Sequence, residues 1–400
     1  MTGAMYSAIS GLKSHMSKLN VIGNNIANVN TYGYKTARMT FRESMYTTLI
    51  AGSNGGENTG GINPSQVGYG ATVGSIDLNM STSTYAPTGV DMDCKIDGEG
   101  FFMVGNKDLD INSGEDLSKL DLTRVGDFFV DPHGYVCDGA GRVVYGFATV
   151  QNPNFNPAQP ISESNPTTIV STQLTALRLP LAAVKPTTDN LGLVGTAPNT
   201  QEMWTEGDPV FPVLTAQNPT TGTRQNLSPV GLPYANTPGD GVASMAVANG
   251  EDACIQLESI NIDATGRISG INKATKGTVV VGYIAIASVD NPSGVTHLDG
   301  PYYKAQGGAG NVRVAVLGGV MEGKYLNNKH LATGDITTST ADAILSGGTT
   351  EIRSGGLEAS STDIATEFSE MITTQRGYQA NTRIVTVTDS MLEELVNMKR

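Results

Sequence analysis

Residues 5–26, MYSAISGLKSHMSKLNVIGNNI, decide how the N-terminal end of this chain is interpreted. Apolar residues recur there at steps of four and three, with a glycine on one step: Met5, Ile9, Leu12, Met16, Leu19 and Ile26. This 3.5-residue spacing is typical of a coiled-coil helix. The segment also contains Gly11 and Gly23, and each glycine costs about 1 kcal/mol of helix stability. We therefore expect a helix that needs a partner.

Residues 363–400 repeat the spacing at the other end of the chain. The apolar positions there are Ile364, Phe368, Met371, Tyr378, Val385, Leu392 and Val396. The preceding residues 360–363, SSTD, offer several helix N-cap candidates. Two distant helices with the same spacing predict a coiled coil, closed either between the two ends of the chain or between subunits. We assign residues 1–30 and 363–400 to one helical coiled-coil domain.

The middle of the chain has the pattern of short strands joined by turns. Residues 128–130 (FFV) and 135–137 (YVC) flank the turn sequence Asp131-Pro132-His133-Gly134, which predicts a hairpin. The sequence Asp263-Ala264-Thr265-Gly266 makes a similar turn between two further apolar stretches. We expect residues 71–150 and 255–362 to form one inner β domain, with a connector over residues 31–70.

The inner β domain is interrupted by a segment of different composition. Thirteen of the 18 prolines lie between Pro153 and Pro238. Proline at this density excludes long helices and central strands. We expect residues 151–254 to be an inserted outer β domain. The predicted fold is thus a mainly β multi-domain protein with paired N- and C-terminal α-helices.

Charge and hydropathy exclude two classes of partner. The formal net charge is −13, with a sequence pI near 4.7 and no compensating basic stripe, which argues against nucleic-acid binding. The longest apolar stretch, Val279–Ala287, is far shorter than the roughly 20 residues of a membrane span, so we expect no membrane insertion. The N-terminus lacks the pattern of a cleavable secretory signal, so any export is expected to use another route.

Residues able to carry chemistry are few and scattered. His133 and Cys137, near Asp131 and Asp138, are of the right types for a metal site, but a hairpin turn and a strand explain them better. The glycines at 307–310 lack the spacing of a phosphate-binding loop. We therefore expect a protein that is not an enzyme, with no catalytic residue, no metal site and no cofactor.

Two terminal motifs resemble a known family. Residues 27–35, ANVNTYGYK, closely resemble the ANxNTxG(F/Y)K stretch that ends the first helix of bacterial flagellar rod and hook proteins. Residues 368–381 resemble that family's C-terminal helix, and residues 97–102 and 123–128 resemble motifs of its β domain. The residues that match the terminal motifs are Ala27, Asn28, Asn30, Thr31, Gly33, Gln375, Arg376 and Asn381.

The resemblance implies a structural protein of the bacterial flagellum. In this family the terminal helices pair around the axis of a hollow tube and the β domains lie outside them. The implied partners are copies of the same chain, the distal rod, hook cap and hook–filament junction proteins, and the flagellar type III export apparatus. The implied location is extracellular, in the hook and basal body. The length of 400 residues favours the hook-forming members, which build a flexible tube that transmits torque from the motor to the filament.

Two rival hypotheses remain at this point: a distal-rod-like protein of the same family, and a secreted β-rich adhesin or carbohydrate-active protein. For the leading hypothesis we expect the helical spacing to mark the assembly interface. Its residues are Ile9, Leu12, Met16, Leu19, Ile26, Phe368, Met371, Tyr378, Leu392 and Val396. We also expect both termini to be largely disordered in an isolated monomer and helical after assembly. Hooks of some bacteria cross-link Cys to Lys, and Cys94 precedes Lys95, but a buried structural thiol is favoured here.

Overall fold

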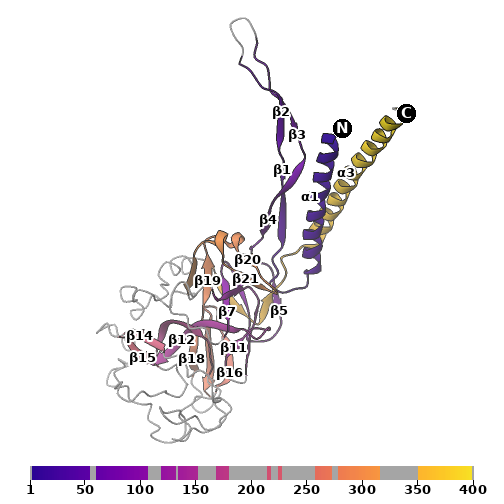
Figure 1. Ribbon diagram of the computed structural model, residues 1–400. Coiled ribbons are helices and arrows are strands. Elements are labelled where there is room, and N and C mark those ends of the chain that lie inside the picture. Colours follow the sequence, from indigo (N-terminus) through magenta and orange to yellow (C-terminus); the bar gives the residue numbers. More distant parts are fainter. Residues whose placement is uncertain are drawn as a thin grey trace, which may run out of the picture. The chain divides into compact units, whose positions relative to one another are not determined.

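The computed structural model shows a mainly β protein with a helix at each end, as the sequence predicts (Figure 1). The chain forms two compact units, which we call the terminal unit (residues 1–80 and 360–400) and the β unit (residues 81–359). The structure describes residues 2–54, 60–106, 119–131, 134–151, 168–179, 214–217, 224–227, 257–272, 278–315 and 350–398.

The terminal unit contains two helices and a long β ribbon. Helix α1 (Thr2–Ala27) packs against α3 (Ile364–Met398) and, on another side, against β1 (Ala37–Glu43) and β4 (Ala71–Leu78), so that it lies between the second helix and the ribbon (Figure 1). Strands β1 and β4 pair antiparallel. The ribbon continues into β2 (Tyr46–Ile50) and β3 (Ser65–Gly68), whose residues are all exposed.

One domain boundary in the structure differs from the boundary predicted from the sequence. Residues 71–78 were expected in the inner β domain, but they pair with residues 37–43 and belong to the terminal unit. The terminal unit therefore extends to Met80 instead of passing into a connector that ends at residue 70. The physical reason is that β1 and β4 complete each other's backbone hydrogen bonds, a pairing of residues too far apart in sequence to be read from local spacing.

The β unit is built around one large sheet, which has 13 strands among the described residues. Its central order is β16-β17-β18-β12-β7-β8-β21-β20, so strands from before residue 151 and after residue 257 lie in the same sheet. The strands of the unit are β5 (Tyr85–Pro87), β6 (Asp93–Asp97), β7 (Phe101–Gly105), β8 (Asp121–Thr123), β9 (Gly126–Asp127), β10 (Phe129–Val130), β11 (Val136–Cys137), β12 (Val143–Gln151), β13 (Thr168–Ala176), β14 (Leu214–Gln217), β15 (Arg224–Leu227), β16 (Leu257–Ile262), β17 (Arg267–Asn272), β18 (Thr278–Ile284), β19 (Ile286–Val289), β20 (Thr296–His297), β21 (Tyr302–Lys304), β22 (Val312–Ala315), β23 (Glu351–Ser354) and β24 (Gly356–Glu358). The described part of the unit also contains two short 3-10 helices, η2 (Pro292–Gly294) and η3 (Gly307–Ala309).

Both turns that the sequence predicts are present. Strands β10 and β11 form the first hairpin, in which the Gly134 amide donates to the Asp131 carbonyl at 3.0 Å. Strands β16 and β17 form the second, in which the Gly266 amide donates to the Asp263 carbonyl at 2.9 Å. Gly134 and Gly266 have φ values of 87° and 76°, a conformation that favours glycine. The hairpin predictions are therefore confirmed.

The main core of the β unit is a large cluster of buried apolar residues. Phe102, Val104, Val144 and Ile286 are fully buried, and the Phe102 and Phe128 rings meet edge to face at 5.0 Å. Most of the expected outer domain, residues 151–254, lies outside the described residues, as do His133 and Cys254. Over the part of the chain that is described, neither helix has an apolar window long enough to cross a membrane.

Candidate assembly surface

The contact between the two terminal helices includes a row of small and polar residues. We call this row the polar seam, and it consists of Gly11, His15, Lys18 and Asn25 of α1 with Glu367, Glu370, Gly377 and Asn381 of α3. The Lys18 Nζ lies 2.9 Å from the Glu370 Oε2, and the Asn25 Nδ2 donates to the Glu367 Oε1 at 2.9 Å.

Two glycines allow the backbones of the helices to approach closely. A Cβ at Gly11 would lie 2.8 Å from the Asn381 Nδ2, and a Cβ at Gly377 would lie 2.7 Å from the His15 ring. Neither position accepts a larger side chain unless its neighbour moves. Burial and the nearby Lys18 charge lower the pKa of His15, so this ring is neutral at neutral pH.

Several serines of α1 contact the ribbon. The Ser14 Oγ donates to the Ala71 carbonyl at 3.0 Å, and the Ser10 Oγ donates to the same carbonyl. Gly70 has a φ of 96°, and a Cβ there would lie 2.9 Å from the Ser7 carbonyl oxygen. Small side chains on α1 thus allow close contact with the ribbon.

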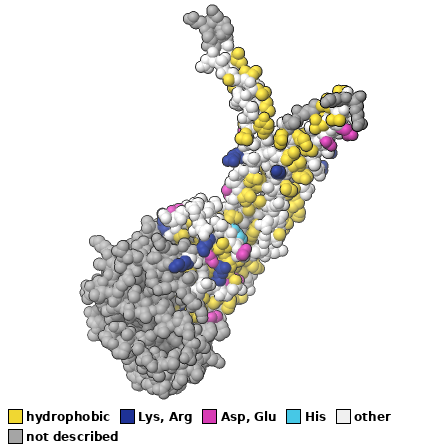
Figure 2. Space-filling model, viewed as in Figure 1, with side chains coloured by type: hydrophobic (Ala, Val, Ile, Leu, Met, Phe, Trp, Pro, Cys, Tyr) yellow, Lys and Arg dark blue, Asp and Glu magenta, His cyan; other side chains and the backbone are white. Residues whose placement is uncertain are grey.

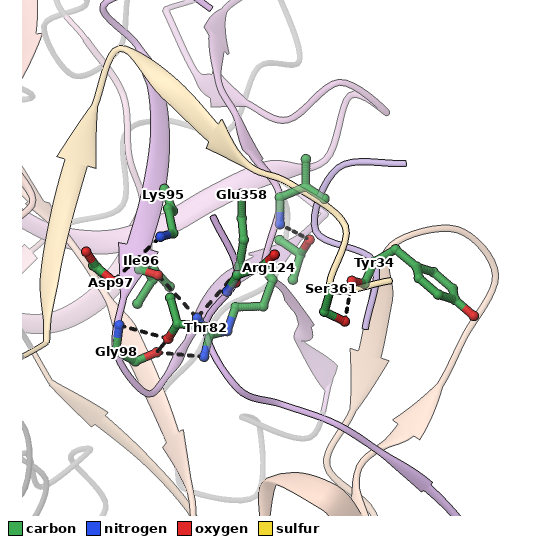
Figure 3. Close-up of polar contacts among 12 residues, drawn as sticks. Tyr34, Thr82, Lys95, Ile96, Asp97, Gly98, Arg124, Glu358 and Ser361 are labelled. Carbon is green, nitrogen blue, oxygen red and sulfur yellow. Dashed lines mark hydrogen bonds and ion pairs between the residues drawn. The ribbon is translucent and has the colours of Figure 1, made fainter. Parts of the chain in front are cut away.

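Asn25 joins three elements at the C-terminal end of α1. It is 1% exposed, donates to the Ala37 carbonyl at 2.9 Å, and accepts from the Ala37 amide at 3.1 Å and the Tyr34 hydroxyl at 3.0 Å. Its amide also reaches Glu367, whose pKa is raised by burial, although the hydrogen bond from Asn25 opposes this shift and the nearby Glu370 charge adds to it. Figure 3 shows Ser361 donating to the Tyr34 carbonyl beside this junction.

The N-terminal motif forms the exit from α1. The Asn28 Nδ2 donates to the Asn24 carbonyl at 2.9 Å, the Thr31 Oγ1 donates to the Asn28 Oδ1 at 3.2 Å, and Gly33 has a φ of 68°. Asn381 of the C-terminal motif lies in the polar seam, where its Nδ2 donates to the Gly377 carbonyl at 3.1 Å. The remaining motif residues are exposed: Ala27, Asn30, Gln375 and Arg376.

The expected interface residues lie outside the polar seam and remain partly or largely accessible. The exposed fractions are 52% for Met16, 49% for Phe368, 37% for Leu392 and 67% for Val396. The other members are half-buried: Ile9, Leu12, Leu19, Ile26, Met371 and Tyr378. Apolar spacing missed the polar seam, although its members on α1, residues 11, 15, 18 and 25, also follow steps of four, three and seven.

Further apolar residues are exposed over the same unit. On α3 they are Ile364, Ile372, Ile384, Val387, Met391, Leu395 and Met398, and on the ribbon they are Phe41, Met45, Tyr46, Leu49, Ile50, Ile62, Val67, Tyr69 and Ile76. Figure 2 shows hydrophobic side chains along both the helices and the ribbon. We call the exposed apolar residues of α1 and α3 the apolar face. Exposed apolar surface of this extent marks an interaction site.

The β unit, by contrast, buries an ion pair made by one of its charged motif residues, Arg124. The Arg124 guanidinium donates to the Gly98 carbonyl at 2.8 Å and lies 3.7 Å from the Glu358 carboxylate, in the group drawn in Figure 3. Arg124 is 2% exposed and Glu358 is fully buried. These contacts join the two β-domain motifs, residues 97–102 and 123–128, to the strand that precedes α3.

The described cysteines lie in environments that suppress thiol reactivity. Cys94 is fully buried, and burial together with the nearby Asp93 charge raises its pKa far above the usual range. Burial raises the pKa of Cys137 to about 11. Both thiols are therefore protonated at neutral pH. Within the described ranges, no three His, Cys, Asp or Glu side chains are grouped so that they could hold a metal ion.

Comparison with known proteins agrees with the terminal motifs. Residues 5–35 match the family model of the flagella basal body rod protein, and residues 353–398 match that of the flagellar basal body rod FlgEFG protein C-terminal region. The chain is 28% identical to the flagellar basal-body rod protein FlgG of Bacillus subtilis over the full length of both. It is 27% identical to the flagellar hook protein FlgE of Borreliella burgdorferi over the full length of both, and 26% identical to FlgE of Escherichia coli over 99% of this chain and all of that one.

Proposed function

Because the chain belongs to the family of flagellar rod and hook proteins, we propose that it is the structural subunit of the flagellar hook. Copies of the chain polymerise into a flexible hollow tube, which transmits torque from the motor and rod to the filament. The function is structural, and the chain acts as a universal joint and not as an enzyme.

The apolar face is the observation that supports polymerisation. Its residues flank the polar seam, so the packing of α1 on α3 within one chain leaves them in contact with water. Full burial of one Val, Leu or Phe side chain is worth about 1.5–3 kcal/mol. Since the two helices cannot cover these residues alone, neighbouring copies are the covering surface in the proposed tube, and the interface residues expected from the sequence belong to it.

The proposal extends to the arrangement of domains and partners. The terminal helices form the inner coiled-coil layer, the split β domain the next, and residues 151–254 the outermost domain. The ends of the tube contact the distal rod, hook cap and hook–filament junction proteins. The chain reaches its extracellular position in the flagellum through the type III export apparatus.

A distal-rod subunit is the second candidate. The chain is 28% identical to a full-length rod protein and 25–27% identical to full-length hook proteins. Sequence identity alone therefore does not distinguish a rod subunit from a hook subunit. The shape and stiffness of the assembled tube do distinguish these two candidates, because a hook tube is curved and flexible whereas a rod tube is straight and stiff.

Electron microscopy of the purified full chain, driven to assemble by a kosmotropic salt, tests the proposal. We expect curved tubes from the natural sequence. A variant with Phe368→Ser, Leu392→Ser and Val396→Ser should stay monomeric, with unchanged unfolding of the β unit. The matched control replaces three exposed polar residues of α3, Thr373→Ala, Gln379→Ala and Ser390→Ala, and should assemble. Straight tubes would indicate a rod subunit, and normal tubes from the apolar variant would contradict the interface.

A further inference from the structure

We propose that the polar seam fixes the register between α1 and α3, with Asn25 as its main positioning residue. The apolar face is then presented to neighbouring copies in a single alignment. The register itself is a property of one chain, and only its consequence for assembly rests on the proposed function.

Apolar spacing alone leaves the register open. Both helices repeat their residue pattern at the same 3.5-residue step, so sliding one helix by seven residues would keep the same faces of the two helices in contact. A polar residue in such a seam selects one register, because its partner exists at only one place on the facing helix. The polar seam contains two such contacts, made by Lys18 and Asn25, and in addition a close approach of Gly11 to Asn381.

Asn25 makes the most hydrogen bonds of these residues, because its side chain bonds β1 as well as α3. Its side chain bonds both the amide and the carbonyl of Ala37, which anchors it to the start of β1. The amide group also reaches Glu367, close to the N-terminal end of α3. At 1% exposure Asn25 has no access to solvent, so a shifted α3 would leave a buried donor without this acceptor.

Other members of the polar seam also contact both neighbours of α1. The Lys18 ammonium pairs with Glu370 of α3 and lies 5.7 Å from the centre of the Phe41 ring of β1. The His15 ring lies 5.3 Å from the same Phe41 ring and packs over Gly377 of α3. Residues 15, 18 and 25 therefore align α3 and the ribbon on α1 together, and sliding α3 breaks contacts along the whole seam.

The close approach of Gly11 and Asn381 provides a direct measurement of register. Thr374, Asn381 and Thr388 lie one heptad apart on α3, and both threonines are buried. Three full-length proteins carry Gly11→Cys with Thr374→Cys, Asn381→Cys or Thr388→Cys, in a Cys254→Ser background. Cys94 and Cys137 are buried and need no change. Oxidation is done on dilute protein in the assembly salt, and mass spectrometry counts disulfides within one chain.

In the parent sequence we expect only the pair at 11 and 381 to cross-link. Asn25→Leu should raise the ratio of shifted to native cross-links at least tenfold, while circular dichroism shows unchanged helix content. Glu367→Ala removes the acceptor from the other side and should act in the same direction. Glu367→Gln keeps an acceptor oxygen and is the matched control, which should retain the parent pattern.

The outcomes separate register from assembly. An unchanged cross-link ratio in both Asn25→Leu and Glu367→Ala would overturn the proposal, as would the absence of the 11–381 cross-link in the parent chain. A second arm follows tube formation, in which Asn25→Leu should give few or irregular tubes. Failure of the parent to form tubes would contradict the proposed function, whereas the cross-link result would still decide the register.

Discussion

Phe102 and Phe368 have the same side chain and opposite surroundings. Phe102 of the β unit is fully buried and meets Phe128, whereas Phe368 of the terminal unit is 49% exposed. The two units differ in the same way more widely, because the β unit has a large buried apolar cluster, whereas the terminal unit buries few apolar residues, Ala8, Ile22 and Met39 among them, and leaves many accessible. Polar contacts also join its two helices. The β unit is thus built to be stable alone, and the terminal unit is built to be completed by neighbours.

The largest expected effect comes from making the same substitution in both units. Phe102→Ala removes a core ring and should lower the free energy of unfolding of the β unit by about 3–5 kcal/mol. Phe368→Ala should change monomer stability by less than about 0.5 kcal/mol, as for other exposed sites. Urea unfolding followed by circular dichroism measures both. Equal losses would show that the terminal unit already has a core of its own.

Local features of the fold could be predicted from the sequence. The turns at Asp131 and Asp263 depend on four consecutive residues, and both terminal helices follow from a spacing that needs no distant partner. These features can be predicted because the interactions that form them join residues close together in the sequence.

Contacts between distant segments could not be predicted in the same way. The pairing of residues 37–43 with 71–78 has no local signal, and in β2 and β3 no face is buried to produce an alternating pattern. The polar seam was missed because spacing analysis counts apolar residues, whereas Gly11 and Asn25 act through close approach and hydrogen bonding. The regular spacing of residues 11, 15, 18 and 25 can be recognised in the sequence only after the structure has shown that these residues form the polar seam.

Replacing a glycine by alanine should change stability by an intermediate amount, and the change should have opposite signs in the two units. A Cβ at Gly126 would lie 2.2 Å from the Cys94 carbonyl oxygen, so Gly126→Ala should destabilise the β unit by about 1–3 kcal/mol. Gly23 of α1 is exposed and has no neighbour within 4 Å of the same position, so Gly23→Ala should stabilise α1 by about 1 kcal/mol. Thermal unfolding and helix content by circular dichroism check the pair. A destabilising Gly23→Ala would contradict the open environment of that residue.

The smallest effect concerns a carboxylate of the β unit. Asp127 lies directly opposite Asp93 in the pairing of β9 with β6. Burial raises the pKa of Asp127, and the nearby charges of Asp138 and Asp93 add to the shift, although the Gly139 amide opposes it. A carboxyl whose pKa is higher in the folded state contributes stability below its unfolded pKa and loses it as the pH rises through the folded pKa. At neutral pH the ionised Asp127 therefore destabilises the β unit.

Asp127→Asn should raise the free energy of unfolding at pH 7, because the amide removes the charge and still offers an oxygen to the Gly139 amide. Like-charged pairs across a sheet cost about 0.2–1 kcal/mol, which corresponds to a rise in Tm of up to about 4 °C in a unit of this size. At pH 3 the gain should disappear, since the natural carboxyl is then protonated in both states. Asp91→Asn, at an exposed position, controls for the change in net charge. A gain that is equal at pH 3 and pH 7 would mean that Asp127 acts through packing and not through its charge.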